Sequence, residues 1–325
     1  MSEHKRDITG ASVAVVGGAG FLGSHLVDHL VEERGCNVLV LDNLITGQKR
    51  FLNKKAKFDW CDITGPEENL YKLFKFYKIE YVFNYAAEPY IPVSFKRPIH
   101  VFGINAFAAL KVMNAAQEAG VKGILQVSSA EIYGNAKGKI TEDEPVFPHS
   151  TYGAAKAAID AMVQVRWREA QTPVIAMRQF NCVGERETHP YVIPEIIYQI
   201  SKAKTKKVTI RLGNNSFRDF QYAGDAVRMA TDLLENGTFG EVYNMGSEEG
   251  IQIYDLAVLI GKQMGVKVTV EQELERVRPW EIWHLQSDNT KLYSAIKTRP
   301  QVNMEEALKR TILWFKENNG KWDFM

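Results

Sequence analysis

A tyrosine and a lysine four residues apart are the side chains best placed for acid–base chemistry in this 325-residue chain. Tyr152 and Lys156 follow Ser150 and belong to an alanine-rich segment that runs to about Arg168, so one face of a helix is expected to carry both. A tyrosine, with a pKa of about 10, is a poor base at neutral pH, but a nearby lysine ammonium stabilises its phenolate and lowers that pKa. The phenolate can then take a hydroxyl proton while a hydride leaves. Taken alone, the same spacing also fits an ordinary amphipathic helix.

A second polar group follows the apolar run 123–127, which we predict to be a buried strand. Ser128, Ser129 and Glu131 come directly after it, with Ala130 among them. Ligands of doubly wound sheets collect at the carboxyl ends of the strands. These residues are therefore expected where a substrate meets its cofactor.

The elements that would position these groups begin with a glycine turn. The apolar run 13–16 predicts a buried strand, and a helix is predicted from the residues that follow Gly20. Gly17 permits the tight turn, Gly20 lets backbone N–H groups approach a pyrophosphate, and Gly23 lets the helix pack close to the strand. We also assign Phe21 and Leu22, which lie within this turn, to the cofactor site.

An acid ends the second predicted strand, 37–41, and indicates which dinucleotide binds. Asp42 lies 19 residues beyond Gly23, close to the position of a ribose-binding acid in such folds. Its carboxylate can accept both hydrogen bonds of a ribose diol, whereas a 2′-phosphate would meet its negative charge. No Arg or Lys occurs at Asn43, Leu44 or Ile45, so we predict NAD rather than NADP, with Asn43 beside it.

Other cofactor contacts are expected at further strand ends and in one helix. They are Asp62 and Ile63 after the third strand, Ala86 and Ala87 after the fourth strand (81–85), and Asn105 in a helix predicted from Phe102 to Ala119 with Gly120 as its C-cap. The alternation of strands and helices predicts an α/β fold, a Rossmann-type doubly wound parallel sheet with helices on both faces. We place the NAD-binding domain at 1–177. Residues 178–325 are expected to form mainly a smaller, mixed α/β substrate lobe, with some segments returning to the main sheet.

Residues of the last third are expected to bind the substrate. Arg218 and Arg278 lie in loops rich in polar and aromatic residues, and forked hydrogen bonds from two arginines can clamp a pyrophosphate. Two solvated surface arginines are the alternative interpretation. We expect the sugar pocket to be shaped by Glu88, Tyr90 and Ser94, and to be lined from the other lobe by His189 and Tyr191.

Composition excludes several classes of protein. Hydrophobic residues at 45% and charged residues at 24% are globular values, and a net charge of +1 gives no electrostatic case for a nucleic acid or a membrane as partner. Cys36, Cys61 and Cys182 show no paired or metal-type spacing, so we predict reduced thiols, no metal site and a cytoplasmic protein. The polar N-terminus is not followed by an apolar segment.

Taken in order, these motifs resemble the extended short-chain dehydrogenase/reductase family, specifically its nucleotide-sugar epimerases and dehydratases, from about Ser12 to Phe315. The matching positions are the glycine turn, Asp62-Ile63, Ala86-Ala87, Ser128-Ser129, Tyr152 to Lys156, Arg178 to Asn181, Arg218-Asp219-Phe220 and Arg278-Pro279. The resemblance implies a two-lobed enzyme that keeps NAD bound through turnover and acts on a sugar diphosphonucleoside. By that match Tyr152 is the base, Lys156 steadies it and the nicotinamide ribose, and Ser129 binds the C4 hydroxyl.

The same resemblance implies that Asn181, Arg218 and Arg278 hold the nucleotide diphosphate. Such enzymes are commonly homodimers that pair the helices containing Tyr152, so a homodimer is expected.

The reaction depends on residues 130 and 131. Sugar 4,6-dehydratases carry a glutamate like Glu131, which abstracts the C5 proton once C4 is a ketone. Members that resemble the dTDP-glucose enzyme also carry an aspartate before it to protonate the departing hydroxyl, and Ala130 cannot do this. Alanine at this position is typical of UDP-galactose 4-epimerase-like sequences. We therefore predict a 4,6-dehydratase, with a C4 epimerase as the first alternative and a non-catalytic NAD-binding protein as the second.

Overall fold

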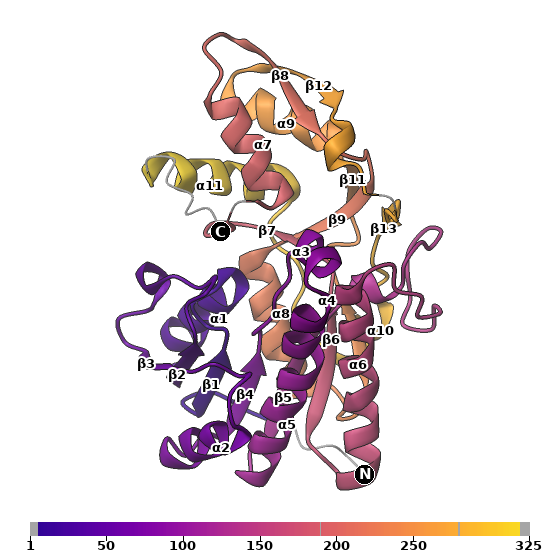
Figure 1. Cartoon of the computed structure of the whole chain (residues 1–325). Coiled ribbons are helices and arrows are strands. Elements are labelled where there is room, and N and C mark those ends of the chain that lie inside the picture. The colour runs from indigo at the N-terminus through magenta and orange to yellow at the C-terminus, as the bar shows by residue number, and fades with distance from the viewer. Residues whose placement is uncertain (1–5, 189, 279, 319–325) are drawn as a thin grey trace.

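A parallel sheet of seven strands forms the centre of the larger lobe in the computed structural model, which describes residues 6–188, 190–278 and 280–318 (Figure 1). In spatial order the strands are β10 (Val242–Met245), β6 (Val174–Gln179), β5 (Gly123–Ser129), β4 (Tyr81–Asn84), β1 (Ser12–Val16), β2 (Asn37–Asp42) and β3 (Lys57–Trp60). Every neighbouring pair is parallel, so all seven carboxyl ends lie at one edge. The predicted fold class is confirmed.

Helices cover both faces of this sheet. On one face Val13 and Val15 of β1 belong to a core with α1 (Phe21–Glu32), α8 (Ala223–Asn236) and α10 (Thr290–Ala295). On the other face Ala14 and Val16 belong to a core with α2 (Glu67–Phe76), α5 (Ala109–Glu118) and α6 (Thr151–Ala170). Successive residues of a strand point to opposite faces, so a strand covered on both sides is apolar throughout. This is why the strands read as unbroken hydrophobic runs.

The helix predicted from Phe102 begins earlier in the structure. Helices α3 (Ile91–Lys96) and α4 (Pro98–Phe102) precede a π-helical turn, η2 (Gly103–Ala108), which continues into α5. Pro98 takes the first helical position, where its missing N–H costs no hydrogen bond. The predicted end is confirmed, because Gly120 follows the helix with a φ of 79°.

The stretch Pro98–Glu118 is also long and apolar enough to cross a membrane, judged by length and composition alone. Half of its most apolar window is buried inside the fold. Val112 and Met113 pack in the same core as Leu70 of α2 and Ile159 of α6. Its apolar face is thus used in packing against the sheet and its neighbouring helices.

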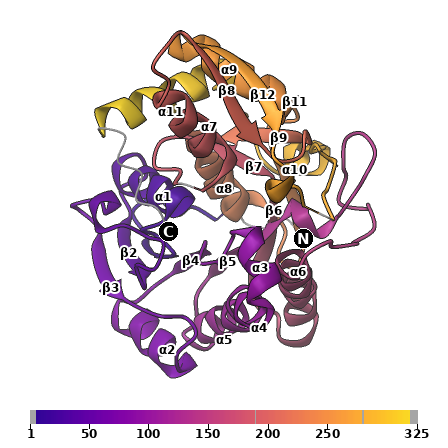
Figure 2. The ribbon, with the colours of Figure 1, turned by 45° about the horizontal axis from the view of Figure 1, so that its top comes forward.

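The smaller lobe lies over the carboxyl edge of the sheet (Figures 1 and 2). Its strands are β7 (Asn181–Val183), β9 (Phe217–Tyr222), β11 (Gly250–Gln252) and β13 (His284–Leu285) in one sheet, and β8 (Lys207–Leu212) with β12 (Lys267–Gln272) in a second. Its helices are α7 (Val192–Ser201), α9 (Ile253–Met264) and α11 (Met304–Glu317), with a short 3₁₀ turn at η4 (Leu274–Arg276). The 3₁₀ turns η1 (Lys49–Phe51) and η3 (Ala130–Ile132) belong to the larger lobe. A separate apolar cluster fills this lobe.

The chain crosses between the lobes more than once. After β6 it enters the smaller lobe, and α8, β10 and α10 then return to the larger one. The return places Asn244 of β10 beside Arg178 of β6. These returning segments complete the edge of the seven-stranded sheet and the core on one of its faces.

Candidate active site

A cleft of about 1130 Å³ lies between the two lobes. It is lined by the residues that the sequence singled out at the strand ends: Gly17, Gly20, Phe21, Leu22, Gly23, Asp42, Asn43, Asp62, Ile63, Ala86, Ala87, Ser128, Ser129 and Glu131. Tyr152 and Lys156 of α6 also line it, as do Glu88, Tyr90, Asn181, Tyr191, Arg218 and Arg278. His189 and Pro279 are outside the described residues.

Two predicted contacts do not reach this cleft. Asn105 is fully buried, and its amide nitrogen donates to the carbonyl oxygens of Glu88 (3.0 Å) and Val101 (2.9 Å). Ser94 is also fully buried, while Pro92 and Phe95 on the same helix line the cleft. A helix turns by about 100° per residue, so neighbouring positions face different surroundings. Asn105 therefore holds the backbone at Glu88 instead of touching a ligand.

The glycine turn has the geometry that a dinucleotide requires. Gly17 has a φ of 79°, and a Cβ on it would lie 2.6 Å from the backbone nitrogen of Ala86. A Cβ on Gly23 would overlap the carbonyl oxygen of Gly17. A Cβ on Gly20 would meet no atom closer than 3.4 Å, so this position is open where the N-terminus of α1 lines the cleft. The first N–H groups of a helix lack intrahelical partners and attract anions.

Backbone hydrogen bonds hold the Asp42 carboxylate in place at the end of β2. Its two oxygens accept from the N–H groups of Ala19 (3.0 Å) and Leu44 (2.8 Å). Burial raises the pKa of Asp42, and these two hydrogen bonds oppose that rise. Asp42 lines the cleft, and each of its oxygens can accept a further hydrogen bond, so the site fits a ribose diol.

We predict that NAD binds far better than NADP and that Asp42→Ala narrows the difference. Removing a charged acceptor from two ribose hydroxyls should lower the affinity for NAD by about 10- to 100-fold. The affinity for NADP should change much less, because the substitution also removes a negative charge that repels the 2′-phosphate of NADP. Calorimetric titration of both cofactors measures this. Asp62→Ala is the comparison, because Asp62 is expected beside the adenine that both cofactors share, so its loss should lower the two affinities equally. Equal affinities in the unmutated protein would contradict the assignment.

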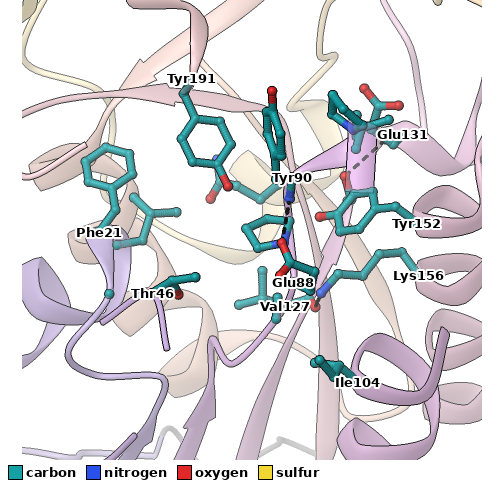
Figure 3. Close-up of a pocket in the computed structure, with 18 of the residues that line it drawn as sticks. Phe21, Thr46, Glu88, Tyr90, Ile104, Val127, Glu131, Tyr152, Lys156 and Tyr191 are labelled. Atoms are coloured by element: carbon teal, nitrogen blue, oxygen red, sulfur yellow. Dashed lines mark hydrogen bonds between the residues drawn. The ribbon is translucent and has the colours of Figure 1, made fainter. Parts of the chain in front are cut away.

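Strand β5 and helix α6 bring the acid–base residues together. Ser150 caps α6, its side-chain oxygen accepting from the N–H of Gly153 at 3.0 Å, so the helix starts at the point that presents Tyr152 to the cleft. The hydroxyl of Ser129 is hydrogen-bonded to Tyr152, and Lys156 Nζ lies 5.8 Å from the Tyr152 ring centre. Figure 3 shows Tyr152 between Lys156 and Glu131.

The expectation that Lys156 lowers the pKa of Tyr152 is wrong for the chain by itself. Burial raises the pKa of Tyr152, and the hydrogen bond with Ser129 only partly opposes this. The ammonium of Lys156 donates to the carbonyl oxygen of Val127 at 2.9 Å instead of to the phenol. Burial also lowers the pKa of Lys156 itself to about 8.

The buried lysine predicts a pH-dependent stability. Between about pH 8 and its ordinary pKa of 10.5, the unfolded chain keeps a proton on Lys156 that the folded chain has released, so the free energy of unfolding rises with pH in this window. At pH 7 the buried charge costs about 3 kcal/mol. Lys156→Met removes this cost but also a hydrogen bond of about 1 kcal/mol. We expect a gain of about 2 kcal/mol at pH 7, measured by urea unfolding.

That gain should disappear as the pH approaches 10.5. Lys111→Met is the control, since Lys111 also donates to backbone carbonyls but is partly exposed. A Lys156→Met protein that is less stable than the parent at pH 7 would show that the lysine is not strained by burial.

Glu131 is the carboxyl group next to this pair. Ser129 Oγ accepts from its backbone N–H at 3.2 Å, which fixes the turn η3. Burial raises the pKa of the Glu131 side chain, against the opposing charges of Arg218 and Arg278. A carboxylate with a raised pKa is a stronger base. Glu131 therefore has the basicity and the place, beside Tyr152, for taking a proton from a bound sugar.

The structure pairs Arg218 with an acid that the sequence analysis had not assigned to the site. Arg218 is 6% exposed, and its guanidinium donates to Glu281 at 2.8 Å and to the carbonyl oxygen of Phe217 at 3.0 Å. The other oxygen of Glu281 accepts from Asn214 at 2.9 Å. Some of the N–H donors of the Arg218 guanidinium are thus already used, and the ion pair with Glu281 orients this side chain. Arg278 stands half-buried in the same wall of the cleft.

Within the described residues, no group of three or more His, Cys, Asp and Glu side chains is arranged to hold a metal ion. Cys36, Cys61 and Cys182 are free.

Comparison with known families gives the context of this site. The model of the family described as GDP-mannose 4,6 dehydratase matches residues 14–311. The chain belongs to this family. It is therefore an extended short-chain dehydrogenase/reductase, an enzyme of the NAD-dependent nucleotide-sugar epimerase/dehydratase class, as the motifs indicated. The predicted cofactor, NAD, is that of the class, and the glycine turn and Asp42 fit it.

Individual relatives of the chain include both kinds of enzyme. A human dTDP-D-glucose 4,6-dehydratase is 29% identical over 95% of this chain and 91% of its own length. The solved UDP-glucose 4-epimerase of Thermotoga maritima, with UDP-glucose, has a TM-score of 0.87 and 29% identity, covering 95% of this chain and 99% of its own. The dTDP-glucose 4,6-dehydratase DesIV of Streptomyces venezuelae, with NAD bound, has a TM-score of 0.87 and 25% identity, covering 96% and 99%.

Proposed function

We propose that this family member is a nucleotide-sugar 4,6-dehydratase that acts through a transient C4 ketone. The observation that carries the proposal is Glu131, a carboxyl group of raised pKa that follows Ser129 at the end of β5, beside Tyr152. A base close to the sugar ring is needed for dehydration and has no chemical use in C4 epimerisation.

The first step is oxidation at C4. Tyr152 takes the proton of the C4 hydroxyl, and Ser129, hydrogen-bonded to Tyr152, orients that hydroxyl. NAD, when bound, supplies the hydride acceptor, a positive charge that favours the phenolate, and later the returning hydride. Lys156 lies buried behind the Tyr152 ring, and its ammonium is proposed to bind the nicotinamide ribose.

The second step is loss of water. With C4 a ketone, the C5 proton is acidic, and Glu131 takes it while the C6 hydroxyl departs as water. Ala130 is 2% exposed, and its methyl side chain has no acidic proton to give. The proton for the leaving hydroxyl therefore comes from Glu131 itself or from a bound water. The lack of a dedicated acid should make this step slower than in enzymes that have one.

A C4 epimerase is the second candidate, and Ala130 is the residue that favours it. An epimerase needs no acid at this position, because it returns the hydride to the opposite face of a rotated ketone. Relatives of both kinds are about equally similar to this chain. The product of the reaction separates the two proposals.

The nucleotide diphosphate is proposed to lie against the smaller lobe, held by Asn181, Arg278 and the part of Arg218 that Glu281 leaves free. Purified protein should be tested by thermal shift against GDP-, UDP-, dTDP- and CDP-sugars. A ligand at 100 times its dissociation constant stabilises by about 2.7 kcal/mol, so one nucleotide should respond strongly. Product analysis with that sugar then tests the reaction, and a C4 epimer as product would refute the dehydratase proposal.

A homodimer through α6 and the neighbouring stretch 98–118 is also proposed. Ile99 and Phe102 on this stretch are 89% and 36% exposed, and apolar side chains of this size support an interface there. Sedimentation of the purified protein tests this, and a monomer at micromolar concentration would refute it.

A further inference from the structure

The cleft contains a second buried acid that the mechanism above does not use. Glu187 lies in the loop between β7 and α7 and lines the cleft. Its side chain belongs to a residue only 5% exposed, and its Oε2 has no hydrogen-bond partner among the residues that the structure describes. A buried carboxyl group without a partner is costly, because it has lost its hydrogen bonds to water.

The loop is fastened just before Glu187, at Glu185 and Arg186. His25 Nε2 lies 2.8 Å from the carbonyl oxygen of Glu185, and Arg186 forms an ion pair of 2.6 Å with Asp28 of α1. The Glu185 carboxylate also accepts from the hydroxyl of Tyr222. These contacts tie the loop to both lobes. The carboxyl group of Glu187 is therefore held in the cleft and does not simply turn outward to reach water.

Tyr191 connects Glu187 to the catalytic residues. The Tyr191 hydroxyl lies within electrostatic reach of Tyr152, Glu88 and Glu187, and its ring packs edge-on against that of Tyr90 with centres 6.0 Å apart. Figure 3 shows Tyr191 across the pocket from Tyr152, with Tyr90 between them. Glu187 thus lines the cleft close to Tyr191.

The chemistry of the surroundings narrows what Glu187 can bind. Burial raises the pKa of Glu187, and no cation among the described residues opposes this rise. An anionic phosphate would be repelled by the charged acid, whereas a sugar carries several hydroxyl donors. Because Glu187 lines the cleft, a bound hydroxyl would give its carboxyl group a hydrogen-bond donor.

We infer that Glu187 is a specificity-determining residue whose carboxyl group accepts a hydrogen bond from a hydroxyl of the substrate's sugar ring. The inference rests on the proposed nucleotide-sugar substrate, but not on whether the reaction is dehydration or epimerisation. It assigns the part of the pocket around Glu187 and Tyr191 to recognition of the sugar, while Arg278 and Asn181 recognise the diphosphate.

Calorimetric titration of the protein with three ligands tests the inference: the nucleotide sugar that stabilises it, the matching nucleoside diphosphate, and NAD. Glu187→Leu should lower the affinity for the nucleotide sugar by about 10- to 100-fold and change the affinities for the nucleoside diphosphate and NAD by less than about threefold. Glu187→Gln, which keeps an acceptor, should restore part of the loss. Glu249→Gln, at an exposed acid that does not line the cleft, is the control and should leave all three affinities unchanged.

A stability measurement shows whether a loss of affinity in Glu187→Leu comes from the lost carboxyl group or from misfolding. Glu187→Leu replaces an unpartnered buried acid with an apolar side chain of similar size, so its melting temperature without ligands should equal or exceed that of the parent. An equal loss of affinity for the nucleotide sugar and the nucleoside diphosphate, a loss for NAD, or no loss at all would each overturn the inference. Formation of a C4 epimer by the parent would refute only the dehydratase proposal.

Discussion

Replacing Tyr152 by phenylalanine is expected to lower kcat by about 100- to 10,000-fold, the usual contribution of a positioned general base. Tyr152 is 8% exposed, its hydroxyl is hydrogen-bonded to Ser129, and Lys156 lies behind it on the same helix. No other hydroxyl in the cleft has this combination of neighbours among the described residues. KM should change little, because the phenylalanine ring fills the same space.

Tyr191→Phe provides the matched comparison. It removes a hydroxyl from the other wall of the same pocket and should raise KM while leaving kcat within about tenfold. Steady-state rates with the responding nucleotide sugar measure both variants. If the Tyr152→Phe enzyme turned over at near the parent rate, another residue of the cleft would have to be the base.

Glu131→Gln is expected to abolish formation of a 4-keto-6-deoxy sugar. The amide is nearly the same size and shape as the carboxyl group but cannot take a proton from C5, so the rate of elimination should fall at least 100-fold. Binding of the nucleotide sugar should be almost unchanged, because Arg218 remains oriented by Glu281. Chromatography of the products and calorimetric titration separate these two effects.

The corresponding control is Glu88→Gln. Glu88 is another carboxyl group of the cleft, held through its backbone oxygen by Asn105 and through its side chain by the N–H of Tyr90. This variant should still give the 4-keto-6-deoxy product. If Glu88→Gln lost product formation while Glu131→Gln kept it, Glu88 and not Glu131 would be the base that takes the C5 proton.

The sequence predicted those parts of the site that depend on local patterns. Asp42, Ala86 and Ser129 each end an apolar run, and the carboxyl ends of parallel strands meet at one edge. Ser150 marks a helix start through its side-chain oxygen, and Gly120 marks a helix end through its positive φ. Such features need no knowledge of distant residues, and the structure places all of them as predicted.

Two kinds of feature were not predictable in this way: the direction in which a side chain points from its helix, and pairs of residues that lie far apart in the sequence. Asn105 and Ser94 lie on helices next to cleft residues, yet they point into the protein, and no sequence pattern fixed that rotation. Arg218 meets Glu281 across 63 residues of chain. The raised pKa of Tyr152 follows from its burial, which the spacing of Tyr152 and Lys156 does not reveal.

Glu187 was missed for a related reason. It follows Asn181 and Gly184 in a short loop, where an acid is usually solvated. Only the contacts of Arg186 with Asp28 and of His25 with Glu185 show that the loop is held against α1. An acid within a loop that follows a predicted strand end is the one signal that the sequence offered.

The proton at C5 gives the most direct test of the central claim. Dehydration removes it to Glu131 and later replaces it from an exchangeable group, whereas epimerisation at C4 never breaks a C5–H bond. The parent enzyme, run in deuterated water with the responding nucleotide sugar, should yield a 4-keto-6-deoxy product that carries solvent deuterium at C5, as seen by nuclear magnetic resonance and mass spectrometry. A C4 epimer with no deuterium on carbon would contradict the assignment of this enzyme as a dehydratase.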